Sequence, residues 1–102
     1  QLLNLDENNI EGIPSMEQYT NLDQLWLAGN NIGKEGCRSI AKLLQNECSS
    51  LRKLNLNCND IGDEAAEIIA DALKHNTTLA NLGLEENKFK EKGCRAFLKL
   101  LN

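Results

Sequence analysis

The sequence predicts an α/β solenoid, with a curved parallel sheet on its concave face and helices on its convex face. Three observations lead to this prediction: a leucine-rich segment that recurs four times, an asparagine at a fixed place in each copy, and amphipathic stretches between the copies. Self-similarity at a period of about 20 to 50 residues is the signature of stacked repeats. We therefore expect a single domain over residues 1–102, with repeat cores near residues 3–10, 22–32, 51–61 and 79–89.

Each repeat core follows one template: leucine, any residue, leucine, any two residues, asparagine, any residue, and a large apolar residue. The copies cover residues 3–10, 25–32, 54–61 and 82–89. Side chains alternate along a strand, so both leucines of each copy are expected to point into the core. The template asparagines are Asn8, Asn30, Asn59 and Asn87, at intervals of 22, 29 and 28 residues. We expect their side chains to form a ladder of hydrogen bonds to the backbone of their own and neighbouring turns.

Amphipathic helices are predicted between the copies, because apolar residues recur there three and four places apart. These stretches are residues 33–44 and 62–73, and a third closes the chain at residues 93–101. Gly36, Ala65 and Gly93 occupy the same small-residue position in the three stretches. The first interval is shorter, and there we expect about one turn of helix near Pro14, since proline suits the first helical position.

The layout resembles the leucine-rich-repeat family across the whole chain, and the long repeats are similar to those of the ribonuclease-inhibitor-like subclass. That subclass includes nuclease inhibitors, innate immune sensors, Ran GTPase-activating proteins and ciliary scaffolds. The resemblance therefore implies the fold more specifically than the function. What it implies in common is a recognition or scaffold module that binds another protein.

Charge and hydropathy exclude two classes of partner. Fifteen acidic residues against eleven basic ones give a net charge of −4, and no run of lysine or arginine could follow a phosphate backbone, so nucleic acid is not expected. No apolar run approaches the roughly 18 residues that cross a bilayer, so no membrane partner is expected.

The cysteines and the single histidine, His75, lack the paired short spacing of a zinc site, and we expect no metal or other cofactor. Cys37, Cys48, Cys58 and Cys94 are expected to be free thiols in a reducing, cytoplasmic compartment. Cys37 and Cys94 occupy equivalent helix positions and are predicted to be small core residues. Asn76, Thr77 and Thr78 match the glycosylation acceptor pattern, which matters only in a secreted chain.

The candidate binding surface consists of the strand residues that point away from the core, on the concave face. Trp26 is central to it, because exposed tryptophans are enriched at interface hot spots; the alternative is that Trp26 only packs over its neighbours. Acidic residues at both ends of the surface favour a partner with a basic patch, although they also suit a solvated rim. The candidate protein-binding residues are Asn4, Asp6, Gln24, Trp26, Lys53, Asn55, Asn57, Asn81, Glu85 and Glu86.

Two function classes remain after these exclusions. The first is a passive recognition or scaffold module, and the alternative is a regulator such as a GTPase-activating protein, which would insert an arginine into a partner's active site. The arginines are Arg38 and Arg95 on the predicted helices and Arg52 near a strand entry. No nucleophile with a base, carboxylate pair or metal cluster indicates an enzyme, so no catalytic residues are assigned.

Repeat arrays need terminal caps with polar outer faces. Neither end of this sequence has the pattern of a cap: the first begins with Gln1 and two leucines, and the last is an apolar helix. We therefore expect further repeats of the same protein to pack against both ends.

Overall fold

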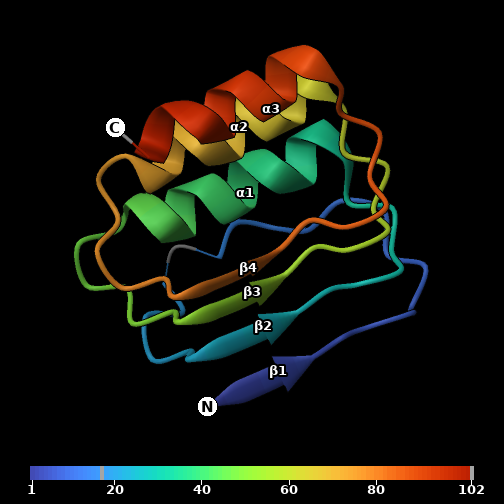
Figure 1. Cartoon of the computed structure of the whole chain (residues 1–102). Coiled ribbons are helices and arrows are strands. Elements are labelled where there is room, and N and C mark those ends of the chain that lie inside the picture. Colours follow the sequence, from blue (N-terminus) through green and yellow to red (C-terminus); the bar gives the residue numbers. More distant parts are fainter. Residues whose placement is uncertain (17, 102) are drawn as a thin grey trace.

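The computed structural model describes residues 1–16 and 18–101 and shows two layers, a parallel sheet and a row of helices. The strands are β1 (Leu2–Asn4), β2 (Gln24–Trp26), β3 (Lys53–Asn55) and β4 (Asn81–Gly83), hydrogen-bonded in the order β1-β2-β3-β4. The helices are α1 (Gly33–Gln45), α2 (Asp63–Leu73) and α3 (Glu91–Leu98), followed by the short 3₁₀ helix η1 (Lys99–Leu101). The predicted α/β solenoid is confirmed (Figure 1).

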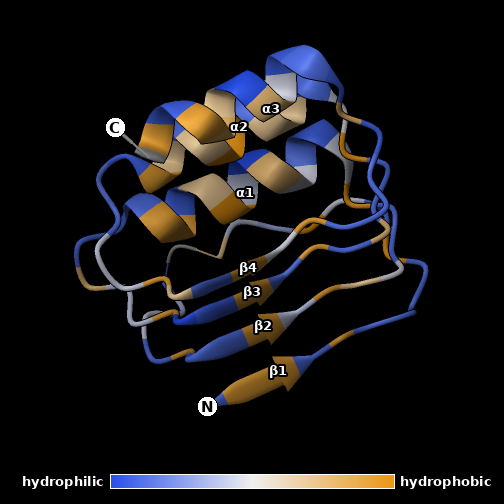
Figure 2. Cartoon of the chain, in the orientation of Figure 1, coloured by the Kyte–Doolittle hydropathy of each residue, from blue (hydrophilic) through white to orange (hydrophobic). Residues whose placement is uncertain are grey.

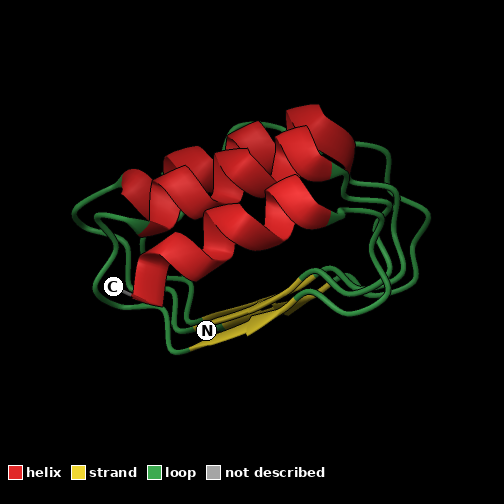
Figure 3. Ribbon diagram, turned by 45° about the horizontal axis from the view of Figure 1, so that its top comes forward, coloured by secondary structure: helices red, strands yellow, loops and turns green. Residues whose placement is uncertain are grey.

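All three helices cover the same face of the sheet (Figure 3). The helix layer forms the convex side, because a helix is about 10 Å wide whereas parallel strands are spaced by about 4.8 Å. The other face of the sheet, which we call the concave face, carries no second layer among the described residues. This face is the part of the fold that is open to a partner.

The leucine alternation positions the core as predicted. Leu25, Leu27, Leu54 and Leu56 are at most 1% exposed, and they pack against buried residues of α1 and α2. The predicted small positions also fit the packing. A Cβ atom at Gly93 would lie 3.0 Å from the Cβ of Ala66 on α2, so a larger residue would push α3 away from its neighbour.

The first repeat differs from what the sequence predicted, and the prediction of a helix near Pro14 is wrong. Residues 12–16 form no helix; Glu11 bridges to Asn31, and the Ile13 carbonyl accepts a hydrogen bond from the Ser39 hydroxyl at 3.0 Å. The physical reason is length. An extended residue advances about 3.3 Å and a helical residue only about 1.5 Å, so the short segment crosses the layer in extended form.

Cys94 is a second correction. The equivalent Cys37 is fully buried on α1, but Cys94 is exposed on α3. Its side chain lies on the outer flank of the last described repeat, in an apolar hollow with Leu84, Phe89 and Phe97. A side chain at this helix position is buried only where a further helix packs against it.

Candidate functional site

The register of the sheet aligns the candidate residues in columns on the concave face. Asn4, Trp26, Asn55 and Gly83 are register partners across the four strands. Gln24, Lys53 and Asn81 form the preceding column, as expected, and Leu2 extends that column onto β1. Leu2 is 52% exposed on this face. It was not among the predicted binding residues, although its place directly before the inward-pointing Leu3 indicated that it points outward. The four strands therefore bring most of the predicted residues onto one surface.

Behind this surface, the template asparagines form the expected ladder. The Asn30 amide nitrogen donates to the Leu5 carbonyl of the preceding repeat at 2.9 Å and to the Leu27 carbonyl of its own at 3.0 Å. Its Oδ1 accepts hydrogen bonds from the backbone N–H groups of Asn8 and Ile10. Asn59 and Asn87 repeat this pattern one and two turns further along. These asparagines are structural, because they satisfy polar groups of the turns.

Four of the candidate binding residues also order the turn that follows each strand. Asn4 and Asn55 each accept a hydrogen bond through Oδ1 from the backbone N–H two residues on, at 3.0 Å. Asp6 Oδ1 accepts from the backbone N–H of Ala28 at 2.7 Å, and Asn57 Oδ1 accepts from that of Glu85 at 2.8 Å. The sequence reasoning assigned these residues to binding alone. Their remaining polar groups are the side-chain N–H₂ of the asparagines and the second carboxylate oxygen of Asp6.

Trp26 is half-buried on the concave face and forms part of a shallow hollow of about 400 Å³. The residues that line the hollow are Asp6, Trp26, Lys53, Leu54, Asn55, Asn57, Asn81, Leu82 and Gly83. Six of the predicted binding residues are thus brought together around one depression, whereas Asn4, Gln24, Glu85 and Glu86 lie outside its lining.

Comparison with known proteins matches these repeats to a family. A model described as leucine-rich repeat matches residues 20–41 and 47–70. The chain belongs to the leucine-rich-repeat family. The aligned leucines of its sheet and its asparagine ladder agree with that match. Its long repeats fit the ribonuclease-inhibitor-like subclass.

Relatives of this leucine-rich-repeat chain are much longer proteins. A human NACHT, LRR and PYD domains-containing protein 13 is 28% identical over 107 aligned residues, covering 98% of this chain and 10% of the relative. Ran GTPase-activating protein 1 of Xenopus laevis is 32% identical over 106, covering 97% of this chain and 18% of the relative. Ran GTPase-activating protein 2 of Arabidopsis thaliana is 36% identical over 64, covering 63% of this chain and 12% of the relative.

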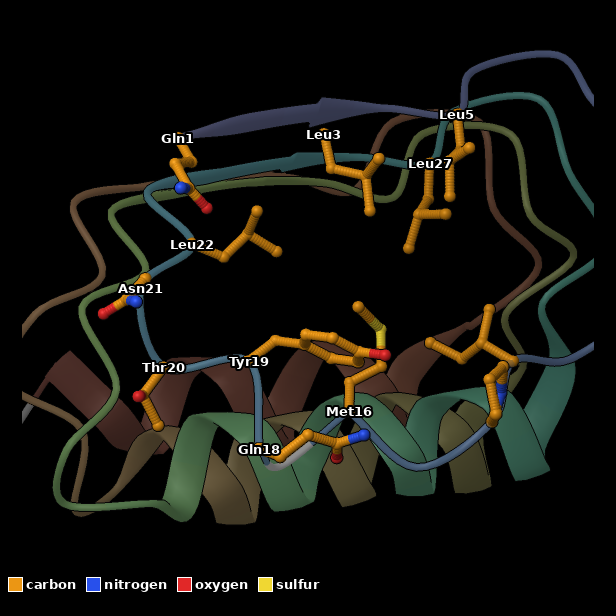
Figure 4. Close-up of a pocket in the computed structure, with 12 residues that line it drawn as sticks. Gln1, Leu3, Leu5, Met16, Gln18, Tyr19, Thr20, Asn21, Leu22 and Leu27 are labelled. Atoms are coloured by element: carbon orange, nitrogen blue, oxygen red, sulfur yellow. The ribbon is translucent and has the colours of Figure 1, made fainter.

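An apolar hollow of about 350 Å³ opens at the flank of the first leucine-rich repeat (Figure 4). Leu3, Leu5 and Leu22 point into it from the sheet side, and Met16 and Tyr19 face them from the segment that replaces the helix. Figure 2 shows β1 as mostly hydrophobic, whereas β2 and β3 begin with hydrophilic residues. The outer flank of the last repeat is also apolar, with Phe89 and Phe97 in a tilted ring contact at 5.7 Å.

None of the described cysteines and arginines lines the hollow on the concave face. Burial raises the pKa of the Cys37 thiol to about 11, so this side chain stays protonated and unreactive at neutral pH. Cys48, Cys58 and Cys94 are free and exposed. Arg38 pairs with Glu35 on α1, and Arg95 pairs with Glu91 at 2.8 Å on α3, as expected for surface residues of the helices.

Asn76, the candidate glycosylation residue, has a structural partner. Its amide nitrogen donates to the Leu44 carbonyl at 2.9 Å, and its Oδ1 accepts from the backbone N–H groups of Thr78 and Leu79. A glycan on this nitrogen would lie directly beside this contact between neighbouring repeats. Among the described residues, no His, Cys, Asp and Glu side chains gather in a group of three that could hold a metal ion. None of the described helices has the length and apolarity to span a membrane.

Proposed function

We propose that this chain is a protein-interaction module that binds a protein partner across the concave face of its sheet. The observation that carries the proposal is the position of Trp26. It is half-buried between the polar side chains of Asn4 and Asn55, on the face of the sheet without a helix layer. Tryptophan contributes a large apolar contact when a partner covers it, and it is enriched at hot spots.

The charges at the two ends of the concave face favour basic groups on the partner. Glu7 is exposed at the β1 end of the surface, and Glu85 and Glu86 are exposed at the β4 end. Asp6 lines the hollow together with Trp26. A partner that places lysine or arginine against these ends would gain electrostatic complementarity and a faster association rate. Gln24 and Asn81 provide polar contacts between the charged ends.

We propose binding rather than catalysis, because the concave face offers contact area but does not bring the carboxylates of Asp6 and Glu85 together as an acid and base pair. Asp6 belongs to the first repeat and Glu85 to the fourth, so these carboxylates are separated by two intervening strands. A general acid and base must both reach the same reacting group. The surface is open, and the hollow at its centre is lined by Asp6, Lys53 and three asparagines together with Trp26, Leu54, Leu82 and Gly83.

Regulation of a GTPase is a second candidate, because two relatives carry the name Ran GTPase-activating protein. Arg52 is the arginine available for that role: it is exposed just before β3, whereas Arg38 and Arg95 are engaged in ion pairs on the helices. A GTP hydrolysis assay on a Ran-type GTPase separates the candidates. Stimulation by the chain that is lost in Arg52→Ala would favour this role over binding alone.

The apolar flanks favour further repeats of the same protein at both ends. Leu2 and Leu3 are 52% and 36% exposed on β1, and Leu98 is 59% exposed on α3. A repeat buries its flank only on a neighbour, so each flank provides a stacking surface.

A cytoplasmic location is proposed from the exposed free thiols Cys48, Cys58 and Cys94, which suit a reducing compartment.

Parallel capture of partners by the wild-type chain, Trp26→Ala and Lys42→Ala tests the proposal, after thermal melts show that all three fold alike. Lys42 is exposed on α1, on the convex side, and serves as the matched control. We expect a partner that binds the wild-type chain and Lys42→Ala, and whose affinity for Trp26→Ala falls roughly 30-fold, as for a hot-spot residue worth about 2 kcal/mol. A partner whose affinity is unchanged by Trp26→Ala would refute the assignment of the concave face.

A further inference from the structure

The hollow on the concave face lies where the column Asn4, Trp26, Asn55 and Gly83 ends in a glycine. Gly83 is the register partner of Asn55, and a Cβ atom on it would lie 2.8 Å from Oδ1 of both Asn55 and Asn57. A side chain at this position would collide with both amides. Without a side chain at Gly83, the two amides can lie close to this strand, and Trp26 and Asn81 also line the hollow.

The orientation of the two amides in the hollow is fixed by the backbone. Asn55 Oδ1 accepts the Asn57 N–H at 3.0 Å, and Asn57 Oδ1 accepts the Glu85 N–H at 2.8 Å. Each Oδ1 is thereby held against the sheet, which leaves Nδ2 as the group for a ligand. No acceptor for either nitrogen is found among the described residues. Every buried side-chain nitrogen or oxygen of the described residues has a hydrogen-bond partner. Since Nδ2 of Asn55 and Nδ2 of Asn57 have none, both atoms reach solvent.

Of the other polar side chains around the hollow, Lys53 and Trp26 are donors, and the exposed Asn81 amide can both donate and accept. The exposed Lys53 ammonium forms no ion pair with any described residue, and Trp26 carries an indole N–H. The opposing group is Asp6, whose Oδ1 already accepts the Ala28 N–H at 2.7 Å. The hollow therefore presents an ammonium and several N–H donors against one partly engaged carboxylate and the amide oxygen of Asn81. It needs acceptors from its ligand.

We propose that this hollow anchors an acidic side chain of the partner, an aspartate or glutamate whose carboxylate accepts hydrogen bonds from Asn55 and Asn57 and pairs with Lys53. The side chain's methylene groups would pack against Trp26. This inference rests on the proposed function and refines it, because it places an acidic anchor at the centre of a surface whose ends favour basic residues. Charge-assisted hydrogen bonds are about twice as strong as neutral ones, which makes the carboxylate the best-matched acceptor.

The test is a nitrogen-15 NMR titration of the 102-residue chain with three small probes. They are the N-acetyl methylamides of glutamate, glutamine and lysine, which differ only in the side chain. We expect the glutamate probe to shift the side-chain amide signals of Asn55 and Asn57 and the indole signal of Trp26 in a saturable way. The glutamine probe should bind about threefold to tenfold more weakly, because it lacks the charge.

Two variants locate the effect. Lys53→Gln should weaken binding of the glutamate probe about threefold to tenfold and weaken binding of the neutral glutamine probe less. Lys42→Gln on α1 is the matched control with no effect. Gly83→Ala should abolish the signal shifts of both probes by displacing the two amides. A melt of each variant checks that the fold is retained.

Stronger shifts by the lysine probe than by the glutamate probe would overturn the inference, and so would a Lys53→Gln variant with wild-type affinity for glutamate. These failures are distinct from failure of the proposed function. A partner lost with Trp26→Ala, together with either of these results, would leave the concave face as the binding surface and remove only the acidic anchor.

Discussion

The two inner repeats and the two outer ones carry the same leucine template, but they bury it to different extents. Leu3, Leu25, Leu54 and Leu82 are register partners in one column. Leu25 and Leu54 are at most 1% exposed, whereas Leu3 is 36% exposed and Leu82 is half-buried. Cys37 and Cys94 differ in the same way on the helices. The template therefore decides which way a side chain points, and the adjacent repeat decides how deeply it is buried.

Two leucines of this column should differ strongly in how much they stabilise the fold. Leu54→Ala should lower the free energy of unfolding by about 2 to 5 kcal/mol, because it removes a buried side chain and leaves a cavity. Leu3→Ala should cost roughly 1 kcal/mol or less, since its side chain is already partly in water. Urea denaturation of both variants measures the difference. Similar losses would mean that the column is buried uniformly in solution, and Leu54→Met, which keeps the volume, checks that position 54 tolerates substitution.

The second contrast is between two rungs of the asparagine ladder. Asn59 is fully buried; it accepts the Ile32 N–H at 3.2 Å and donates to the Leu27 carbonyl at 2.8 Å. Asn59→Ala should cost roughly 2 kcal/mol, because each buried polar group left unpaired costs about 1 to 3 kcal/mol. Asn8→Ala should cost less than about 0.5 kcal/mol, since Asn8 is exposed and donates one bond, to Asp6. Urea denaturation decides, and an equal cost would contradict the comparison.

A carboxylate on α2 makes a weaker, pH-dependent contact with the start of α3. Asp63 on α2 accepts hydrogen bonds from the backbone N–H groups of Lys90 at 2.6 Å and Gly93 at 3.0 Å, at the start of α3. These bonds, first that from Lys90 and then that from Gly93, lower the pKa of Asp63 from its ordinary value of 3.8. The stability they contribute is therefore fully present above pH 3.8 and is lost as the pH falls through the lower pKa of the folded state.

Asp63→Ala should accordingly reduce the melting temperature at pH 7 more than Asp71→Ala, a substitution of the same kind on the same helix. Asp71 pairs with Lys74 within one exposed helical turn, and such pairs contribute little. The gap in melting temperature between wild type and Asp63→Ala should narrow as the pH falls from 7 toward 2. Circular dichroism melts measure it, and a gap independent of pH would show that the carboxylate charge has no part in the contact.

Much of the fold could be predicted from local pattern. The leucine spacing predicted the strands, the three- and four-residue spacing predicted the helices, and the fixed asparagines predicted the ladder. The outward columns followed from alternation, so Trp26 and Lys53 could be placed on one face. Leu2 was missed because the template was aligned from Leu3 onward, although the same alternation applied to it. Whether the predicted residues bind a partner remains a proposal.

Tertiary structure decided the features that depend on what lies next to a residue. Pro14 favours a helix start locally, but the segment had too few residues to cross the layer as a helix. Cys94 has the same sequence position as Cys37 but lacks a neighbouring helix among the described residues. The hollow beside Trp26 depends on Gly83, two strands away in the sheet, and on amides fixed by the next turn. By itself the sequence determined the period and direction of each side chain, because these follow from local backbone geometry; burial and the shape of the surface arise only when separate repeats are brought into contact.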